Sequence, residues 1–449
     1  MESNKRRKIE HSHPEENKVR EDPPLDLVAT TDPAFEKIGP LVTANNVLQK
    51  YQKLIVDLIY GKDNTHHTNV LPGPLPAGYH ARHMKAMREN LDGYFATCKM
   101  DGLRYMMLIT SRGTYIANRK FTLRRVLDSY YKDKFGQYGD TLLDGELVWN
   151  QYGEMRYMVF DCCAINSEII VGDPLSVRLK AVCHLTSEAA KNPMERDRTN
   201  IPMFNKVMVR LTDLKSGLLD FMIPYPVGHG YTYTDPYGFK VLSDGLVFMT
   251  EGPGYLFQEK ESLLKWKPDN TIDVMARVPE SPEDDISLYH FDKTNKEEIE
   301  LGNGAVEPTL WDRIISQSAG AKAVCVECAW DKKEKVWRIE RARLDKKKPN
   351  HFFTIEDTMD CINEDLTHEK LVAGLVPRPP EKEGEAGEKA IKKKAVPSVS
   401  SQSRPPPPAK TGGPSKSAVS VCFFLSFFSF FLSWCAFYFL LCTVCLPRS

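Results

Sequence analysis

The spacing of apolar residues predicts one opening helix and then a body made mostly of strands. Apolar side chains repeat at helical spacing between Val47 and Leu58. From residue 93 to 275, short apolar or alternating runs are separated by Gly and Asp, which is typical of strands. The clearest runs are Tyr105–Ile109, Leu142–Val148, Tyr157–Phe160 and Leu246–Met249, and helical patterns intervene at Leu175–Ala190 and Met208–Met222. This mixture predicts an α+β fold with antiparallel sheets.

A second block with a different pattern follows the first. Strand patterns at Ala323–Trp330 and Trp337–Ala342 precede a helical pattern that starts at Ile355. Its size and short strands predict a small barrel. Between Lys332 and Lys348 there are nine Lys/Arg and three Asp/Glu, a local net charge of +6.

Composition divides the 449 residues into five segments. They are a polar N-terminal tail with a basic cluster (1–40), a folded body (41–275), the barrel domain (276–375), a Pro/Lys/Glu-rich disordered linker (376–417) and a hydrophobic tail (418–446). The hydrophobic fraction of 42% excludes disorder of the whole chain. The 60 Lys+Arg balance the 60 Asp+Glu, so the protein has no net charge that would attract nucleic acid at long range. The seven cysteines before the tail are scattered, which is typical of reduced intracellular thiols.

Both ends of the chain carry signals that have two interpretations. Lys5–Lys8 is a basic run that fits a nuclear import signal or a solvated tail. Val421–Leu446 is uncharged and rich in Phe, Leu and Cys, and it is long enough to span a bilayer, which takes about 20 apolar residues. It is either a C-terminal transmembrane anchor or the translation of non-coding sequence in a gene model.

The strongest candidate for chemistry is Lys99-Met100-Asp101-Gly102-Leu103-Arg104. Strand patterns flank Asp101-Gly102, so we expect a tight turn with Lys99 at a strand end and Arg104 near it. A lysine amine is a nucleophile only when it is neutral, a state that burial and neighbouring cations favour. Asp-Gly turns are common, so this segment alone does not establish a site.

Five further segments follow in a fixed order. They are Asp144-Gly145-Glu146, Tyr157–Asp161, Ser243–Phe248, Leu263–Pro268 and Arg341–Lys346. Together they supply cations for phosphates, carboxylates for a divalent metal and an aromatic face for a base. These are the groups that nucleotidyl transfer requires.

In this order the six motifs resemble those of mRNA capping enzymes of the RNA guanylyltransferase type. These belong to the covalent nucleotidyltransferase superfamily, which includes ATP-dependent DNA and RNA ligases, and the resemblance covers roughly residues 40–365. It implies a nucleotidyltransferase (ATP-grasp-like ligase) domain of antiparallel sheets with a C-terminal OB-fold barrel. It also implies transfer of GMP from GTP through a lysyl-GMP intermediate to a 5′-diphosphate RNA end, with Mg²⁺ or Mn²⁺.

The resemblance assigns a role to each matching position. Lys99 is the implied nucleophile, and Glu146 and Asp244 are the implied metal ligands. Phe160 is the implied base-stacking aromatic, with Tyr157 as the alternative. The implied nucleotide-binding residues are Asp101, Arg104 on the ribose, Arg119, Glu146, Lys265 and Lys267 on the α-phosphate, and Arg341, Asp345 and Lys346 on the β,γ-phosphates.

The chain departs from the family pattern at one motif and lacks the signatures of two other capping activities, and these differences indicate its expected partners. Leu71-Pro72-Gly73-Pro74-Leu75-Pro76 keeps the family's Pro-Gly-x-x-Pro core but lacks its Gln. No signature of a cysteine-phosphatase-type RNA triphosphatase and no methyltransferase motif is present. We therefore expect a separate RNA triphosphatase, nascent mRNA with a 5′-diphosphate, the phosphorylated tail of RNA polymerase II as a further partner, and a nuclear location.

Three alternatives stay open at this point. The first is an ATP-dependent polynucleotide ligase of the same superfamily. The second is a degenerate, non-enzymatic fold that binds RNA through its basic segment. The third concerns Cys325-x-x-Cys328, which invites a zinc interpretation but lacks a second Cys/His pair, so packed thiols are the better prediction.

Overall fold

The computed structural model describes residues 38–64, 71–225, 230–252, 254–255, 262–281, 284–318 and 320–376. The basic run Lys5–Lys8, the linker after residue 376 and the hydrophobic segment Val421–Leu446 lie outside these residues. Within them, no helix is both long enough and apolar enough to cross a bilayer.

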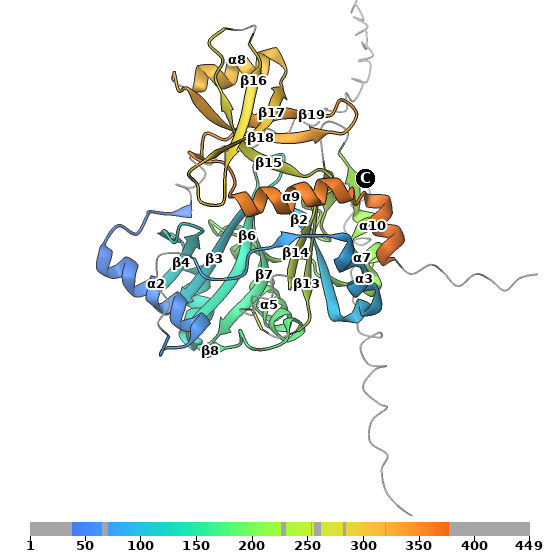
Figure 1. Ribbon diagram of the computed structural model, residues 1–449. Helices are drawn as coiled ribbons and strands as arrows, with labels where there is room; N and C mark the ends of the chain where they lie inside the picture. Colours follow the sequence, from blue (N-terminus) through green and yellow to red (C-terminus); the bar gives the residue numbers. More distant parts are fainter. Residues whose placement is uncertain are drawn as a thin grey trace, which may run out of the picture. The chain divides into compact units, whose positions relative to one another are not determined.

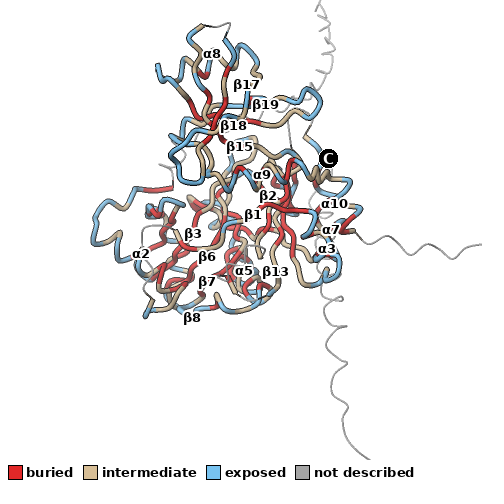
Figure 2. Tube along the Cα trace, in the orientation of Figure 1, coloured by how far each residue is buried: buried red, intermediate tan, exposed pale blue. Residues whose placement is uncertain are grey.

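The first sheet explains why the predicted strand Tyr105–Ile109 is apolar at every position. Its strands run in the order β5-β4-β3-β6-β7-β8, with β9 added parallel to β7. Met106 and Leu108 share a buried cluster with residues of α2, whereas Met107 and Ile109 share one with residues of α5. Figure 1 shows α2 and α5 beside this sheet, and Figure 2 shows its central strands buried. A strand buried on both faces has no polar alternation to show. The bounds are α2 (Asn45–Tyr60), β3 (Gly102–Thr110), β4 (Gly113–Asn118), β5 (Leu123–Arg125), α4 (Tyr130–Phe135), β6 (Thr141–Trp149), β7 (Met155–Ile165), β8 (Glu168–Ile169), α5 (Leu175–Ala190), α6 (Pro193–Asp197) and β9 (Met203–Asn205).

The second sheet contains the strand that ends near Lys99. The order β1-β14-β13-β12-β11 is extended by β2, which pairs with β13, and by β10, which pairs with β2. Met87 of α3, Leu214 of α7 and Leu371 of α10 are buried in its core. The bounds are β1 (Ala77–Gly78), α3 (Ala81–Glu89), β2 (Tyr94–Met100), β10 (Val209–Arg210), α7 (Leu214–Gly217), β11 (Met222–Pro224), β12 (Tyr231–Thr234), β13 (Lys240–Thr250), β14 (Leu263–Trp266) and α10 (His368–Leu375).

The third unit is a closed barrel with the order β15-β16-β17-β19-β18. Ile314 of α8 and Ile355 of α9 belong to its core. Helix α9 contacts both β15 of the barrel and β1 of the second sheet, so it touches both units (Figure 1). The bounds are β15 (Thr271–Arg277), β16 (Ile286–Phe291), β17 (Glu298–Ala305), α8 (Pro308–Gln317), β18 (Ala323–Asp331), β19 (Val336–Ala342) and α9 (Phe352–Glu364).

The α+β class, the antiparallel sheets and the small barrel are confirmed, but two local predictions are wrong. Asp101-Gly102 does not close a hairpin, because β2 pairs in the second sheet and β3 in the first. The pattern over Met208–Met222 is not one helix, because Val209 and Arg210 pair with β2 as strand and α7 ends at Gly217. Glycine has a low helix propensity, so Gly217 favours the end of α7 at that position.

Candidate active site

Lys99 lies at the end of β2, beside a break in the neighbouring strand β13. The pairing of β13 with β2 shifts register between Ser243 and Leu246. Gly245 makes this bulge possible, since its φ is +146° and a Cβ there would lie 2.0 Å from the carbonyl oxygen of Trp266. The bulge leaves Asp244 next to Lys99, whose Nζ lies 2.7 and 2.8 Å from the two carboxylate oxygens.

A second lysine shares the same carboxylate. Lys267, just after β14, places Nζ 2.6 Å from Asp244 Oδ2. Burial alone would raise the pKa of Asp244, but the charges of Lys267 and Lys99 outweigh it and lower the pKa. Burial would likewise lower the pKa of Lys267, yet Asp244 raises it. One carboxylate therefore pairs with two lysines from different parts of the chain, and its charge raises the pKa of Lys267.

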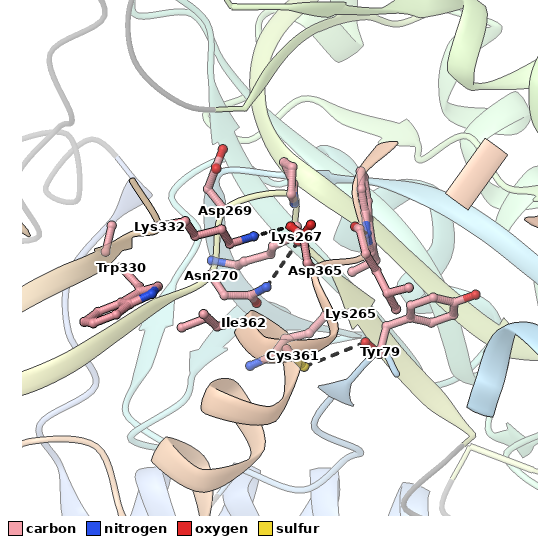
Figure 3. A pocket seen from close by; sticks show the side chains of 14 residues that line it. Tyr79, Lys265, Lys267, Asp269, Asn270, Trp330, Lys332, Cys361, Ile362 and Asp365 are labelled. Carbon is pink, nitrogen blue, oxygen red and sulfur yellow. Dashed lines mark hydrogen bonds and ion pairs between the residues drawn. The ribbon is translucent and has the colours of Figure 1, made fainter. Parts of the chain in front are cut away.

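Lys265 stands apart from this arrangement. Its ammonium makes no hydrogen bond or ion pair with any residue that the structure describes. Its pKa is lowered, first by burial and then by the charges of Lys267 and Lys99. It lines a pocket of about 80 Å³ with Lys267, Trp330 and Cys361 (Figure 3). A half-buried cation that makes no ion pair creates a place for an anion.

Arg104 is fixed in place by buried groups. Its Nε and Nη2 lie 3.0 and 2.6 Å from the two oxygens of Asp144, whose side chain is fully buried. Its Nη1 donates to the carbonyl of Pro74, and Tyr255 donates its hydroxyl to Asp144. Burial would lower the pKa of Arg104, but the Asp144 charge raises it. Gly73 allows the proline segment to come this close, because its φ is +118° and a Cβ would lie 2.6 Å from Arg104 Nη2.

The aromatic and carboxylate positions meet beside Arg104. Phe160 of β7 lies 6.0 Å from the Arg104 guanidinium carbon and 5.7 Å from Lys206 Nζ, measured to its ring centroid. Lys206 Nζ lies 2.7 Å from Glu146 Oε2. The ring of Phe160 is half-buried, so part of its surface is open.

Three carboxylates of the site influence one another. The pKa of Asp101 is raised, first by desolvation and then by the charge of Asp244, and Glu146 adds to the shift. Carboxylate oxygens are the donors that Mg²⁺ prefers, and carboxylates that repel each other gain from a shared cation. Asp101, Asp244 and Glu146 therefore supply the donor type that a divalent metal takes, and Asp244 and Glu146 stay its predicted ligands.

Two candidates do not join this group. Tyr157 is fully buried, and its hydroxyl donates to the carbonyls of Tyr105 and Leu143, so it is a core residue rather than a stacking surface. Arg119 is exposed just after β4 and makes no hydrogen bond or ion pair with the described residues. Cys325 and Cys328 are buried thiols in β18.

The barrel residues of the last motif are paired within the barrel. Arg341 Nε lies 2.7 Å from Glu327 Oε2, and Lys346 pairs with Asp273. Asp345 accepts two hydrogen bonds from Arg343. The Arg341 charge does reach Asp101, whose pKa it lowers slightly against the other influences.

Sequence reasoning missed three residues that hold the site together. Asp144 belongs to a motif already singled out, and its position in an apolar strand was the available signal. Lys206 and Tyr255 lie where no local pattern marks them. Only their packing against Glu146 and Arg104 shows what they do.

A lysine and a second lysine that share one carboxylate, with further cations beside them, form the kind of site that nucleotidyl transfer requires. The description "mRNA capping enzyme, catalytic domain" matches residues 36–269, and "mRNA capping enzyme, C-terminal domain" matches residues 269–372. The chain belongs to the mRNA capping enzyme family, and its enzyme class is the nucleotidyltransferases, which act on nucleotides with a divalent metal.

Curated relatives agree with this placement. The chain is 28% identical to the mRNA-capping enzyme subunit alpha of Schizosaccharomyces pombe, covering 68% of this chain and 79% of the relative. It is 25% identical to the subunit of the same name in Saccharomyces cerevisiae, covering 75% and 84%. It is 22% identical to the mRNA-capping enzyme of Mus musculus, covering 67% of this chain and 49% of the relative.

Proposed function

We propose that this protein is a GTP:mRNA guanylyltransferase with Lys99 as the nucleophile. The observation that carries the proposal is the shared carboxylate: Asp244 holds both Lys99 and Lys267, with the unpaired Lys265 beside them. A triphosphate brought to these cations would have its α-phosphorus next to the amine. The family match favours this function over the ligase alternative.

The first half-reaction follows from these contacts. Phe160 offers a face to the base and Arg104 reaches the ribose, while Lys265 and Lys267 hold the α-phosphate. Lys99 loses a proton to solvent, and its lone pair forms the phosphorus–nitrogen bond. The bond to the β-phosphate breaks, and pyrophosphate leaves with that electron pair. A divalent metal at Asp244 and Glu146 would neutralise phosphate charge during this step.

The second half-reaction restores the lysine. A terminal oxygen of a 5′-diphosphate RNA attacks the same phosphorus, the phosphorus–nitrogen bond breaks and the amine takes up a proton. The product is a GpppN end. Lys265 and Lys267 stabilise the phosphate charge in both steps, because they do not depend on the leaving group.

The barrel supplies the remaining cations in this scheme. Arg341 and Lys346 would exchange Glu327 and Asp273 for the β- and γ-phosphates. That exchange couples barrel movement to GTP binding. We also assign the barrel to the OB-fold, on the basis of its five strands and their order.

We further propose that the enzyme works with separate proteins in the nucleus. The fungal relatives are named as alpha subunits, which supports a partner subunit such as an RNA triphosphatase. The basic run Lys5–Lys8 supports nuclear import. Binding of the phosphorylated polymerase tail would bring the enzyme to nascent transcripts.

The test is to incubate the purified protein and a divalent metal with α-labelled GTP or α-labelled ATP and run a denaturing gel. We expect label from GTP alone, released by pyrophosphate and absent in Lys99→Ala. Label from ATP alone would make the protein a ligase. Label from neither would favour a non-enzymatic role.

A further inference from the structure

Three side chains of types that ligate metals lie where helix α9 meets β1 and α3. His80 precedes α3, while Asp357 and Cys361 lie four residues apart and therefore on one face of α9. One ligand atom from each lies within 4.8 Å of the others. We propose that these three side chains bind a Zn²⁺ ion that fastens α9 to the second sheet.

The spacing of the three ligand atoms fits a tetrahedral ion. His80 Nε2 lies 3.0 Å from Asp357 Oδ1 and 3.8 Å from Cys361 Sγ, which is also 3.9 Å from His80 Nδ1. Ordinary zinc bonds at tetrahedral angles separate nitrogen from oxygen by about 3.4 Å and nitrogen from sulfur by about 3.6 Å. Binding would separate Asp357 from Nε2 by a few tenths of an ångström and turn the Cys361 side chain away from Nδ1 toward the Nε2 side. Imidazole, thiolate and carboxylate are donors for zinc, whereas Mg²⁺ requires oxygen.

A carboxylate outside the three ligands orients the histidine. Glu364 Oε1 lies 3.4 Å from His80 Nδ1, and its other oxygen accepts a hydrogen bond of 2.7 Å from the backbone of Ala81. Histidines that bind a metal commonly donate their second ring N–H to such a carboxylate. Glu364 thus lies on the Nδ1 side of the ring, while Nε2 faces Asp357, the side from which the ion would bind.

Burial and access are both suitable for an ion. His80 and Cys361 are 2% and 8% exposed, whereas the Asp357 side chain is 37% exposed and offers an entry. Solvent water can take the fourth position from that side. At Gly78 a Cβ would lie 2.6 Å from Asp357 Oδ2 and 2.8 Å from Cys361 Sγ, so glycine permits the close approach. On binding, the thiol proton passes to solvent and sulfur binds as thiolate.

The bound ion would restrain the position of α9 relative to the second sheet. The ligands are 277 positions apart in the chain, and α9 also packs on β15 of the barrel. An ion that binds only the native arrangement stabilises it in proportion to its occupancy. Zinc would hold α9, and through it the start of the barrel, against the sheet that carries Lys99.

The experiment uses the full chain after chelator treatment, with Co²⁺ as the probe. We expect a thiolate-to-cobalt charge-transfer band with tetrahedral absorption, and a melting temperature that rises when Zn²⁺ replaces Co²⁺. The band should disappear in Cys361→Ser, and Asp357→Asn should weaken binding at least tenfold. Cys183→Ser is the matched control, because that thiol is exposed on α5 and should leave the band unchanged.

Circular dichroism of each variant establishes that it is folded, and the half-exposed Asp357 makes its variant the decisive one if Cys361→Ser does not fold. No band in the unaltered protein, the same band in Cys361→Ser, or unchanged affinity in Asp357→Asn would overturn the proposal. None of these readouts involves GTP, so their failure leaves the guanylyltransferase proposal unaffected.

Discussion

The cations of the second sheet and those of the barrel are neutralised in opposite ways. In the sheet, one carboxylate serves two ammonium groups, and a third, Lys265, makes no hydrogen bond or ion pair with the described residues and feels Asp357 only at longer range. In the barrel, Arg341 and Lys346 each pair with a carboxylate of the barrel itself. The sheet thus keeps one cation outside any ion pair and ready for an anion, whereas the barrel must give up a partner first.

This difference indicates a division of work. A site with excess positive charge binds phosphate and stabilises charge that develops during transfer. A site whose cations are already paired gains less from phosphate, because the ion pair must be broken. We therefore expect changes in the sheet to affect chemistry and changes in the barrel to affect binding of the leaving group.

The largest effect should come from Lys99→Arg. A guanidinium stays protonated and cannot attack phosphorus, so the labelled covalent adduct should disappear completely. The measurement is α-labelled GTP retained on a denaturing gel. Lys53→Arg is the control, since that lysine pairs with Asp57 on the outer helix α2 and should retain full labelling. Residual adduct in Lys99→Arg would place the nucleophile elsewhere.

Asp244→Asn should have the next largest effect. The amide cannot neutralise Lys99 and Lys267 together, and it is a weaker ligand for a divalent metal. We expect the rate of adduct formation at saturating GTP to fall about 100-fold or more. Asp220→Asn, at an exposed pair with Lys215, should leave the rate unchanged. A loss seen only at low GTP would mean that Asp244 acts in binding alone.

A change in the barrel should be smaller and of a different kind. Arg341→Ala removes one charged hydrogen-bonding group, which corresponds to a loss of about 10- to 100-fold in kcat/KM for GTP. Pyrophosphate should also reverse the adduct less efficiently, because it binds to the same group. Arg338→Ala, on the same strand and paired with Asp331, is the matched control. Equal effects of the two variants would contradict the division of work.

The sequence predicted the helices and strands whose formation depends on residues close together in the chain. Helix α2, the strand that ends near Lys99 and the strand around Asp244 followed from local periodicity. The Asp-Gly pair indicated a turn, but it could not show that β2 and β3 enter different sheets. Sheet membership is decided by partners far away in the chain, which a local pattern does not contain.

In the candidate active site, too, local patterns do not reveal contacts between residues that are far apart in the chain. Lys99 and Asp244 are 145 positions apart, and the order of the motifs indicated that both matter without showing their contact. Arg119 matched in order, yet no described residue contacts its charge. Lys206 meets Glu146 across 60 positions with no signal of its own. Motif order identifies the residues, and packing identifies their partners.

The smallest effect concerns the uncompensated cation Lys265. Its pKa lies below the ordinary lysine value, so it loses its charge at a lower pH than a solvated lysine. Equilibrium binding of GTP to Lys99→Arg protein, in which no chemistry occurs, should therefore weaken by about tenfold or less as pH rises toward the ordinary lysine range. In Lys99→Arg with Lys265→Arg the group stays charged, and this slope should vanish even if affinity drops. An unchanged slope would mean that another group titrates, and that Lys265 has no part in holding phosphate.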